Sequence, residues 1–345
     1  MLYTTTRGKH DIVTAFKAAH NDCYTDGGLF VPFRIQKFDK ERLNSFSVLS
    51  PSQIIAEILN EFFACKLTSL DVERVLGRKP IHTSGAGRYL QTVELWHNTG
   101  ADTNWLVRRF SDSILGEAKR TLPSNWMHIA VRIALIAASY GQLLSAGSVT
   151  RHQVVDVAVT SGDFAMPMAA WYARQLGFPI GNIVCGCNAN GGFWDLLNRG
   201  EFATGDAAVR TCTAEVDIVV PRNLERLICA TLGVEETKRY LQCCSRGRHY
   251  VISEELLAQL GQGMFAAVIS DSRVESIIPG VWQTTGRVLS PYAALAYGSL
   301  QDYWSMTGHT RTALLIEERS PKRDGKYVSA LLHLNEDELR RAVEQ

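Results

Sequence analysis

The sequence has no CxxC pair and no histidines at the spacing of a zinc site, so the usual ligands of a structural metal are missing. No apolar run reaches about 18 residues, and the first residues carry no signal-peptide pattern. The net charge is only +1, which gives no field that would attract nucleic acid or an anionic membrane. We therefore expect a cytoplasmic protein without a metal, and neither nucleic acid nor a membrane as partner.

The eight cysteines lie mostly in apolar stretches, and we expect them to be reduced, buried thiols. Cys185 and Cys187 are two residues apart on a predicted strand, so both side chains point to one face. A redox or catalytic role for them stays open as the minor alternative, because nothing nearby in the sequence would lower a thiol pKa.

From about residue 124, short apolar segments alternate with helical patterns. We predict strands at 154–160, 182–187, 216–220, 265–270 and 312–318. We predict helices at 51–65, 126–144, 167–176, 192–199, from 221, 291–306 and 336–343, and a loop or domain edge at 77–89. This alternation predicts an α/β fold with a mostly parallel sheet and helices on both faces. Ligands of such sheets bind beyond the carboxyl ends of the strands.

A polar turn follows the strand predicted at 154–160. Ser161, Gly162 and Asp163 stand there, at the start of the next predicted helix. Such a turn presents free N–H groups and the positive end of a helix dipole, which together can hold an anion. The alternative is that these residues only cap the helix.

Several segments, taken in chain order, resemble threonine synthase, a pyridoxal-phosphate (PLP) enzyme of the tryptophan-synthase-β fold type. These segments are YTTTRG (3–8), DGGLFVP (26–32), VELWHNTGADTNW (93–105), the stretch 157–202 beginning VAVTSGDFA, VDIVVPRNLERL (216–227) and LSPYAALAYGSL (289–300). The resemblance implies an α/β core at 91–345 like the family's large domain. Residues 1–90 would form a mostly helical N-terminal lobe packed against it.

The departures from the family pattern concern its cofactor. The resemblance places the family's Schiff-base lysine at Asn104, and an amide cannot form an imine with PLP. The sequence has no lysine between Lys119 and Lys238 that could replace it. A small α/β segment that the family carries before the helix at 126–144 is also missing. We interpret the chain as a shortened, degenerate member that uses no cofactor.

Four positions at the expected site carry a carboxylate where the family has a small or neutral residue. They are Asp102, Asp163, Glu317 and Glu318. Clustered carboxylates repel a phosphate, favour a cation, and can split their pKa values into an acid and a base. Alternatively, these acids only solubilise a surface that the lost segment once covered.

The resemblance, with these changes, gives the candidate site residues. As catalytic groups we predict His97, Asp102, Asp163 and Glu318; as substrate-binding groups Arg132, Ser161, Gly162, Asn104 and Asn188. Arg132 corresponds to the family's phosphate-contacting arginine and is expected to hold a ligand carboxylate. His97 is the best single base, although a histidine beside Trp96 is more often structural.

Three functions stay open. The first is a PLP-independent enzyme that eliminates, substitutes or cyclises a small activated or cationic amino acid in biosynthesis. The second is a non-catalytic protein that binds a metabolite or pairs with a complete homologue, and the third is residual use of PLP. We also expect a homodimer, because losing a segment would expose apolar surface such as the helix at 126–138.

Overall fold

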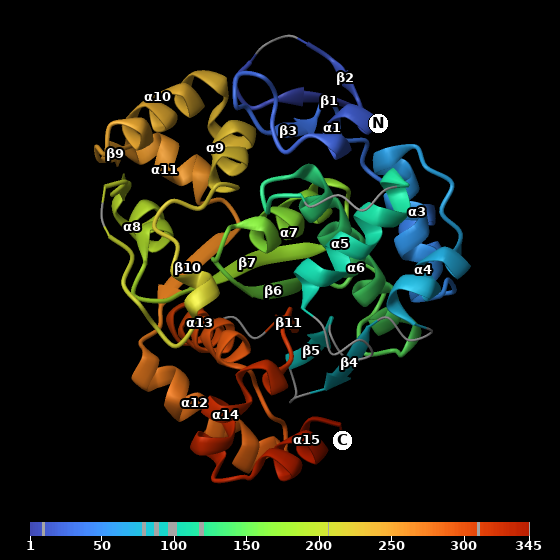
Figure 1. Ribbon diagram of the computed structural model, residues 1–345, viewed down its shortest axis with the longest axis vertical. Helices are drawn as coiled ribbons and strands as arrows, with labels where there is room; N and C mark the ends of the chain where they lie inside the picture. Colours follow the sequence, from blue (N-terminus) through green and yellow to red (C-terminus); the bar gives the residue numbers. More distant parts are fainter. Residues whose placement is uncertain are drawn as a thin grey trace.

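The computed structural model describes residues 1–8, 11–77, 81–85, 90–95, 102–116, 121–205, 207–308 and 311–344. Within these residues the centre is a six-stranded sheet in the order β10-β7-β6-β11-β5-β4 (Figure 1). Its strands are β4 (His82–Gly85), β5 (Leu90–Glu94), β6 (Val155–Thr160), β7 (Ile180–Cys187), β10 (Met264–Val268) and β11 (Ala313–Glu317). All neighbours pair in parallel except β4, which runs antiparallel to β5 at one edge. The α/β fold with a mostly parallel sheet is therefore confirmed.

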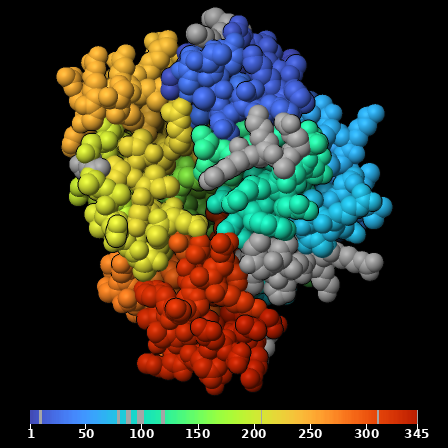
Figure 2. Space-filling model, viewed as in Figure 1, coloured from blue at the N-terminus to red at the C-terminus, as the bar shows by residue number. Residues whose placement is uncertain are grey.

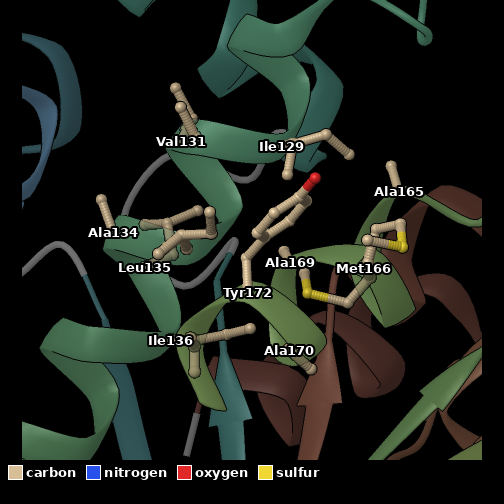
Figure 3. Packing of buried hydrophobic residues seen from close by; sticks show 14 of the residues in the cluster. Ile129, Val131, Ala134, Leu135, Ile136, Ala165, Met166, Ala169, Ala170 and Tyr172 are labelled. Atoms are coloured by element: carbon tan, nitrogen blue, oxygen red, sulfur yellow. The ribbon is translucent and has the colours of Figure 1, made fainter. Parts of the chain in front are cut away.

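Helices cover both faces of this sheet. The side chains of β6 alternate between the two faces, so Val157 and Val159 join one apolar cluster and Ala158 joins the other. The first cluster contains α6 (Trp126–Ser145) and α7 (Ala165–Gln175), and the second contains α12 (Asp271–Thr285) and α13 (Pro291–Thr307). Figure 3 shows side chains of α6 and α7, Tyr172 among them, packed into the space between the two helices.

Helix α6 lies in the interior of the chain. It is long and apolar enough to cross a membrane, but 89% of its most apolar window is buried inside the protein. Every residue from Trp126 to Gly141 is buried. The expectation that this helix presents an exposed apolar face is therefore wrong. Helices α3 and α7 cover it, so the lost segment leaves no bare surface here.

The N-terminal part contains strands as well as helices. Strands β1 (Leu2–Thr5), β2 (Val13–Thr14) and β3 (Phe30–Pro32) form a small antiparallel sheet. Its helices are α1 (Ala15–His20), α2 (Lys40–Ser45), α3 (Pro51–Phe63) and α4 (Ser69–Leu76). The predicted helix at 51–65 is confirmed as α3, which begins with a capping box of Ser50 and Gln53. A lobe boundary at residue 90 stays a prediction; β4, at 82–85, belongs to the central sheet.

The remaining elements complete the chain. They are α5 (Thr103–Leu115), α8 (Gly192–Arg199), β8 (Glu201–Phe202), η1 (Ala214–Val216), α9 (Leu224–Leu232), α10 (Val234–Ser245), β9 (Tyr250–Val251), α11 (Glu254–Leu260), η2 (Pro321–Asp324), α14 (Gly325–Leu332) and α15 (Glu336–Glu344). The predicted strand at 216–220 is wrong, because this segment forms the end of η1 and a loop. The carboxylate of Asp217 accepts hydrogen bonds from Thr211 and Asn188, which hold the segment without a strand partner.

All eight cysteines are free. Cys185 and Cys187 are both fully buried on β7, as their spacing predicts, whereas Cys23 is exposed. Burial raises the pKa of Cys187 to about 11 and that of Cys185 well above its ordinary value. These two thiols therefore stay protonated at neutral pH, which favours the structural interpretation.

Candidate functional site

A pocket of about 340 Å³ opens beyond the carboxyl ends of β6 and β11, at the sheet edge where the sequence predicts it. Figure 2 shows a hollow near the middle of this face, where segments coloured teal, yellow and red meet. Of the predicted site residues, the pocket is lined by Asp102, Asn104, Arg132, Ser161, Gly162, Asp163 and Glu318. In sequence they range from Asp102, directly before α5, to Glu318, directly after β11.

Two of the predicted site residues, Asn188 and His97, are not among the described residues that line the pocket. Asn188 is buried after β7, where its amide group donates to the hydroxyl groups of Thr211 and Thr213 (2.9 and 3.0 Å). It therefore positions the loop that carries the pocket residues Val216 and Ile218, rather than facing the cavity itself. His97 lies outside the described residues, so its role stays a prediction.

The turn before α7 supplies its own negative charge. Asp163 Oδ1 accepts a hydrogen bond from the N–H of Ala165 (2.8 Å), the first residue of the helix. Gly162 and Phe164 have positive φ values of 38° and 66°, so the backbone of this turn is left-handed at both residues. Burial raises the pKa of Asp163, and the Arg132 charge and the Ala165 N–H partly oppose this. The sequence left open whether this helix end binds an anionic ligand or is only capped. In the structure the Asp163 carboxylate already caps it.

Arg132 is held by three hydrogen bonds to the protein itself. Its side chain is only 5% exposed, and its Nε donates to Glu318 Oε1 at 2.8 Å. Its two terminal nitrogens donate to the His128 carbonyl (3.2 Å) and to Asn104 Oδ1 (3.0 Å). Burial and the Arg132 charge lower the pKa of His128 to about 3, so this neighbour is neutral. The arginine expected to hold a ligand carboxylate therefore already binds one, that of Glu318.

Glu318 faces both an arginine and a second acid. Burial raises the pKa of Glu318; Arg132 lowers it and the negative charge of Asp163 raises it further. Glu318 and Asp163 are thus two carboxyl groups of one pocket whose pKa values are both raised, so each holds a proton more readily than a free carboxyl group does. Such a pair can accept a proton from a ligand or attract a ligand cation.

The acids at the rim are paired. Asp102 caps α5 through the N–H of Trp105 (2.8 Å) and forms an ion pair with Arg323. Glu215 pairs in the same way with Arg319.

Among the lining residues that sequence reasoning missed, the charged and aromatic ones are Glu215, Tyr292 and Arg319. The guanidinium group of Arg319 lies 5.1 Å from the centre of the Tyr292 ring. Arg319 directly follows Glu318 at the end of β11, so the rule on strand ends could have found it. Glu215 and Tyr292 carry no comparable signal in the sequence.

The residues of the pocket do not fit an imine-bound PLP. None of the described lining residues is a lysine. Asp102, Asp163, Glu215 and Glu318 oppose only two lining arginines, and each of those already binds a carboxylate. A phosphate dianion would enter a site with excess negative charge and no free guanidinium group among these residues.

Comparisons with known proteins show what this chain is similar to in sequence and in fold. Residues 2–78 match the family described as threonine synthase N terminus. Threonine synthase-like 1 of Macaca fascicularis is 28% identical over 176 residues, which cover 50% of this chain and 24% of the relative. Threonine synthase-like 2 of Xenopus laevis is 22% identical over 399 positions, covering 86% of this chain and 83% of the relative. The chain is therefore similar in sequence to threonine synthase-like proteins, first of all over its N-terminal residues.

The similarity has two limits. The match spans only about a quarter of the length of threonine synthase-like 1. PLP-bound threonine synthase from Brucella melitensis has a TM-score of 0.84 with 15% identity, and covers 100% of both chains. Yeast threonine synthase has a TM-score of 0.83 with 15% identity, covering 99% of this chain and 93% of the other. At such identities the structural likeness shows the fold alone.

The alignment with the Xenopus relative also bears on the missing segment. It spans 399 positions, whereas this chain has only 345 residues. The relative therefore carries residues inside the matched region that this threonine synthase-like chain lacks. This agrees with the interpretation of the chain as a shortened family member.

Glu317 does not share the pocket with Glu318, although sequence reasoning placed both at the rim. Successive residues of a strand point to opposite faces, and Glu317 is buried, in register with Glu94 of β5. A terminal nitrogen of Arg287 donates to both carboxylates, at 3.0 Å to Glu317. This second cluster is separate from the candidate site.

The Glu317 cluster makes stability depend on pH. Burial and the nearby Glu94 raise the pKa of Glu317 from 4.5 to about 7, and Arg287 opposes the shift. Between about pH 5 and 7 the folded chain keeps a proton that the unfolded chain has released, so the free energy of unfolding falls as pH rises. Urea unfolding at pH 5, 6 and 7 should show a fall of more than about 1 kcal/mol, which Glu317→Gln flattens. The exposed Glu254→Gln serves as control; an unchanged slope in Glu317→Gln would disprove this origin.

Proposed function

We propose that this threonine synthase-like chain is a PLP-independent enzyme that acts on a small amino acid with a cationic or activated side chain. The reaction class is elimination, substitution or cyclisation in biosynthesis. One observation carries the proposal. The carboxylates of the pocket outnumber its arginines, and Arg132 is occupied by Glu318. Such a site attracts a positive group and repels a phosphate.

The chain's own residues have distinct roles in this proposal. Asp163 and Glu318 have raised pKa values and both line the pocket, so in this proposal they hold the cation and move the proton. Asn104 keeps the guanidinium plane of Arg132 in place (3.0 Å). The N–H groups of Gly162 and Asp163 have no hydrogen-bond partner within the described residues, and they can bind the ligand carboxylate. Asp102, fixed by Arg323, closes one side of the pocket.

A second candidate function is supported by the internal pairing of the site. Three of the four lining acids already form ion pairs, which are Asp102 with Arg323, Glu215 with Arg319 and Glu318 with Arg132. A pocket that neutralises itself is stable without any ligand. This favours a non-catalytic protein that binds a metabolite or pairs with a complete homologue.

Asp163→Asn separates the two functions. Removing this charge should weaken binding of L-lysine, used as the cationic probe, about tenfold or more, because the variant loses the lining acid that no arginine pairs with. Calorimetry measures the affinity, and mass spectrometry of the incubated amino acids measures turnover. Conversion that Asp163→Asn abolishes supports the enzyme, whereas binding without conversion of any candidate amino acid supports the second function. Equal affinity of wild type and variant would disprove the role of Asp163.

The partner predictions stay proposals. We propose that the chain works in the cytoplasm without nucleic acid or membrane, and as a homodimer. The dimer was first suggested by an apolar face of α6 that was expected to be exposed. That face is buried within one chain, so no surface among the described residues now supports the dimer. Light scattering on the eluted protein tests it: a mass of twice 38.3 kDa supports a dimer and a mass of 38.3 kDa contradicts it.

A further inference from the structure

A second cavity, of about 520 Å³, is lined by residues of η2, α14 and α15. Helices α14 and α15 lie near the C-terminus in Figure 1. Its charged lining differs in sign from that of the candidate site. Four basic residues, Lys322, Arg323, Lys326 and Arg340, face only two acids, Asp324 and Glu336. We call this cavity the basic pocket.

Lys322 and Arg323 form ion pairs with Glu344 and Asp102, so Lys326 and Arg340 carry the positive charge that is left for a ligand of the basic pocket. Asp324 is bound by Arg319 through two hydrogen bonds (3.0 and 3.1 Å), so it does not neutralise the lysines. Lys326 forms no ion pair within the described part of the chain. Arg340 lies near Glu344, whose carboxylate already accepts a hydrogen bond from Lys322 (2.6 Å).

We propose that the basic pocket binds a small polyvalent anion, carrying phosphate groups or several carboxylates. Like charges gathered around one cavity repel one another, and a bound anion relieves that repulsion. Lys326 and Arg340 belong to different helices, α14 and α15, so they can approach one anion from two sides. Their N–H groups form charge-assisted hydrogen bonds with phosphate or carboxylate oxygens.

The basic pocket is connected to the candidate site through one arginine. Arg323 lines the basic pocket and pairs with Asp102, which lines the candidate site. An anion that attracts the Arg323 guanidinium group leaves the Asp102 charge uncompensated, which raises the affinity of the candidate site for a cation. By linkage, a cation there raises the affinity of the basic pocket for the anion to the same extent. This coupling rests on the proposed function, whereas anion binding itself does not.

Inorganic pyrophosphate, titrated into the full chain by calorimetry at constant ionic strength, tests anion binding. The wild type should bind one equivalent, and the double variant Lys326→Ala/Arg340→Ala should bind about tenfold more weakly or worse. The double variant Lys238→Ala/Arg199→Ala removes the same charge from exposed positions elsewhere and should bind as the wild type does. Citrate distinguishes a preference for phosphate from one for carboxylates. No saturable binding of either anion, or equal binding by both double variants, would overturn the proposal.

L-lysine titrations with and without saturating pyrophosphate test the coupling. Pyrophosphate should strengthen L-lysine binding about fivefold in the wild type and leave Arg323→Gln unaffected, because that variant has no guanidinium group to withdraw from Asp102. Pyrophosphate binding without any effect on L-lysine affinity would overturn the coupling, whereas the proposal that the basic pocket binds an anion would stand. Absence of L-lysine binding would overturn the coupling together with the proposed function, while the pyrophosphate titration still decides the basic pocket.

Discussion

Replacing Arg226 by methionine is expected to lower the free energy of unfolding by at least about 3 kcal/mol. Arg226 is fully buried, and it donates to the carbonyls of Phe30 (3.1 Å) and Ser124 (2.8 Å) and to the side chain of Asn223. Methionine fills a similar space but leaves these acceptors without a donor, and each unsatisfied buried group costs about 1–3 kcal/mol. The three acceptors belong to the N-terminal sheet, the start of α6 and the start of α9, so the loss affects the whole chain.

Urea unfolding of Arg226→Met and Arg199→Met measures this effect with a matched control. Arg199 lies on the surface of α8, where it pairs with Asp195 and its side chain is 64% exposed. An exposed pair of this kind contributes about 0–1 kcal/mol. Similar losses in both variants would show that Arg226 is no more important than a surface arginine.

Arg226 also bears on the site. Its partner Asn223 donates to the carbonyl of Asp163 through the backbone N–H (3.3 Å) and the side-chain amide (3.0 Å). The turn that carries Asp163 is therefore held by the same network that joins the N-terminal sheet to the core. Any folded fraction of Arg226→Met should consequently bind L-lysine more weakly than the wild type.

Arg132→Met is expected to cost about 3–5 kcal/mol of stability, and a second substitution, Glu318→Met, is expected to restore much of it. The single change leaves the Glu318 carboxylate, whose side chain is 26% exposed, without its cation. The double change removes both charges and fills the space with apolar atoms. Arg132 and Glu318 thus depend on each other for stability, independently of any ligand.

A double-mutant cycle measured by urea unfolding tests this dependence. The coupling free energy between the two positions should exceed about 1 kcal/mol. Additive losses in the double variant would mean that the two side chains act independently, and Glu318 could then not be said to occupy Arg132.

The sequence was most informative where regular structure and strand ends were concerned. Strands β6, β7, β10 and β11 follow their apolar patterns, and the position of the pocket follows from the ends of β6 and β11. The resemblance assigned Asn104 and Arg132 to one binding site, and the structure joins them by a hydrogen bond although 28 residues separate them. Neither inference needed knowledge of the side-chain contacts.

What the sequence could not supply is the pairing of charges. Four acids at a predicted site look alike in sequence, yet Glu318 binds Arg132 while Glu317 points to the other face and binds Arg287. Alternation along β11 separates the two acids in principle, but the choice of partner depends on Arg287, which is 30 residues away. The strand predicted at 216–220 was wrong for a related reason. The hydrogen bonds of the Asp217 carboxylate, and not the apolar pattern, decide the conformation of this segment.

The central claim is that this threonine synthase-like pocket works without PLP, and one measurement tests it most directly. The purified protein is mixed with one equivalent of PLP, its absorbance is recorded, and it is reduced with borohydride and digested for mass spectrometry. We expect no absorbance band of a protonated imine and no lysine peptide carrying a stoichiometric pyridoxyl group, because Asn104 cannot form the imine and no described lining residue is a lysine. A band that borohydride abolishes, together with one pyridoxyl group per chain on a single lysine, would contradict the account.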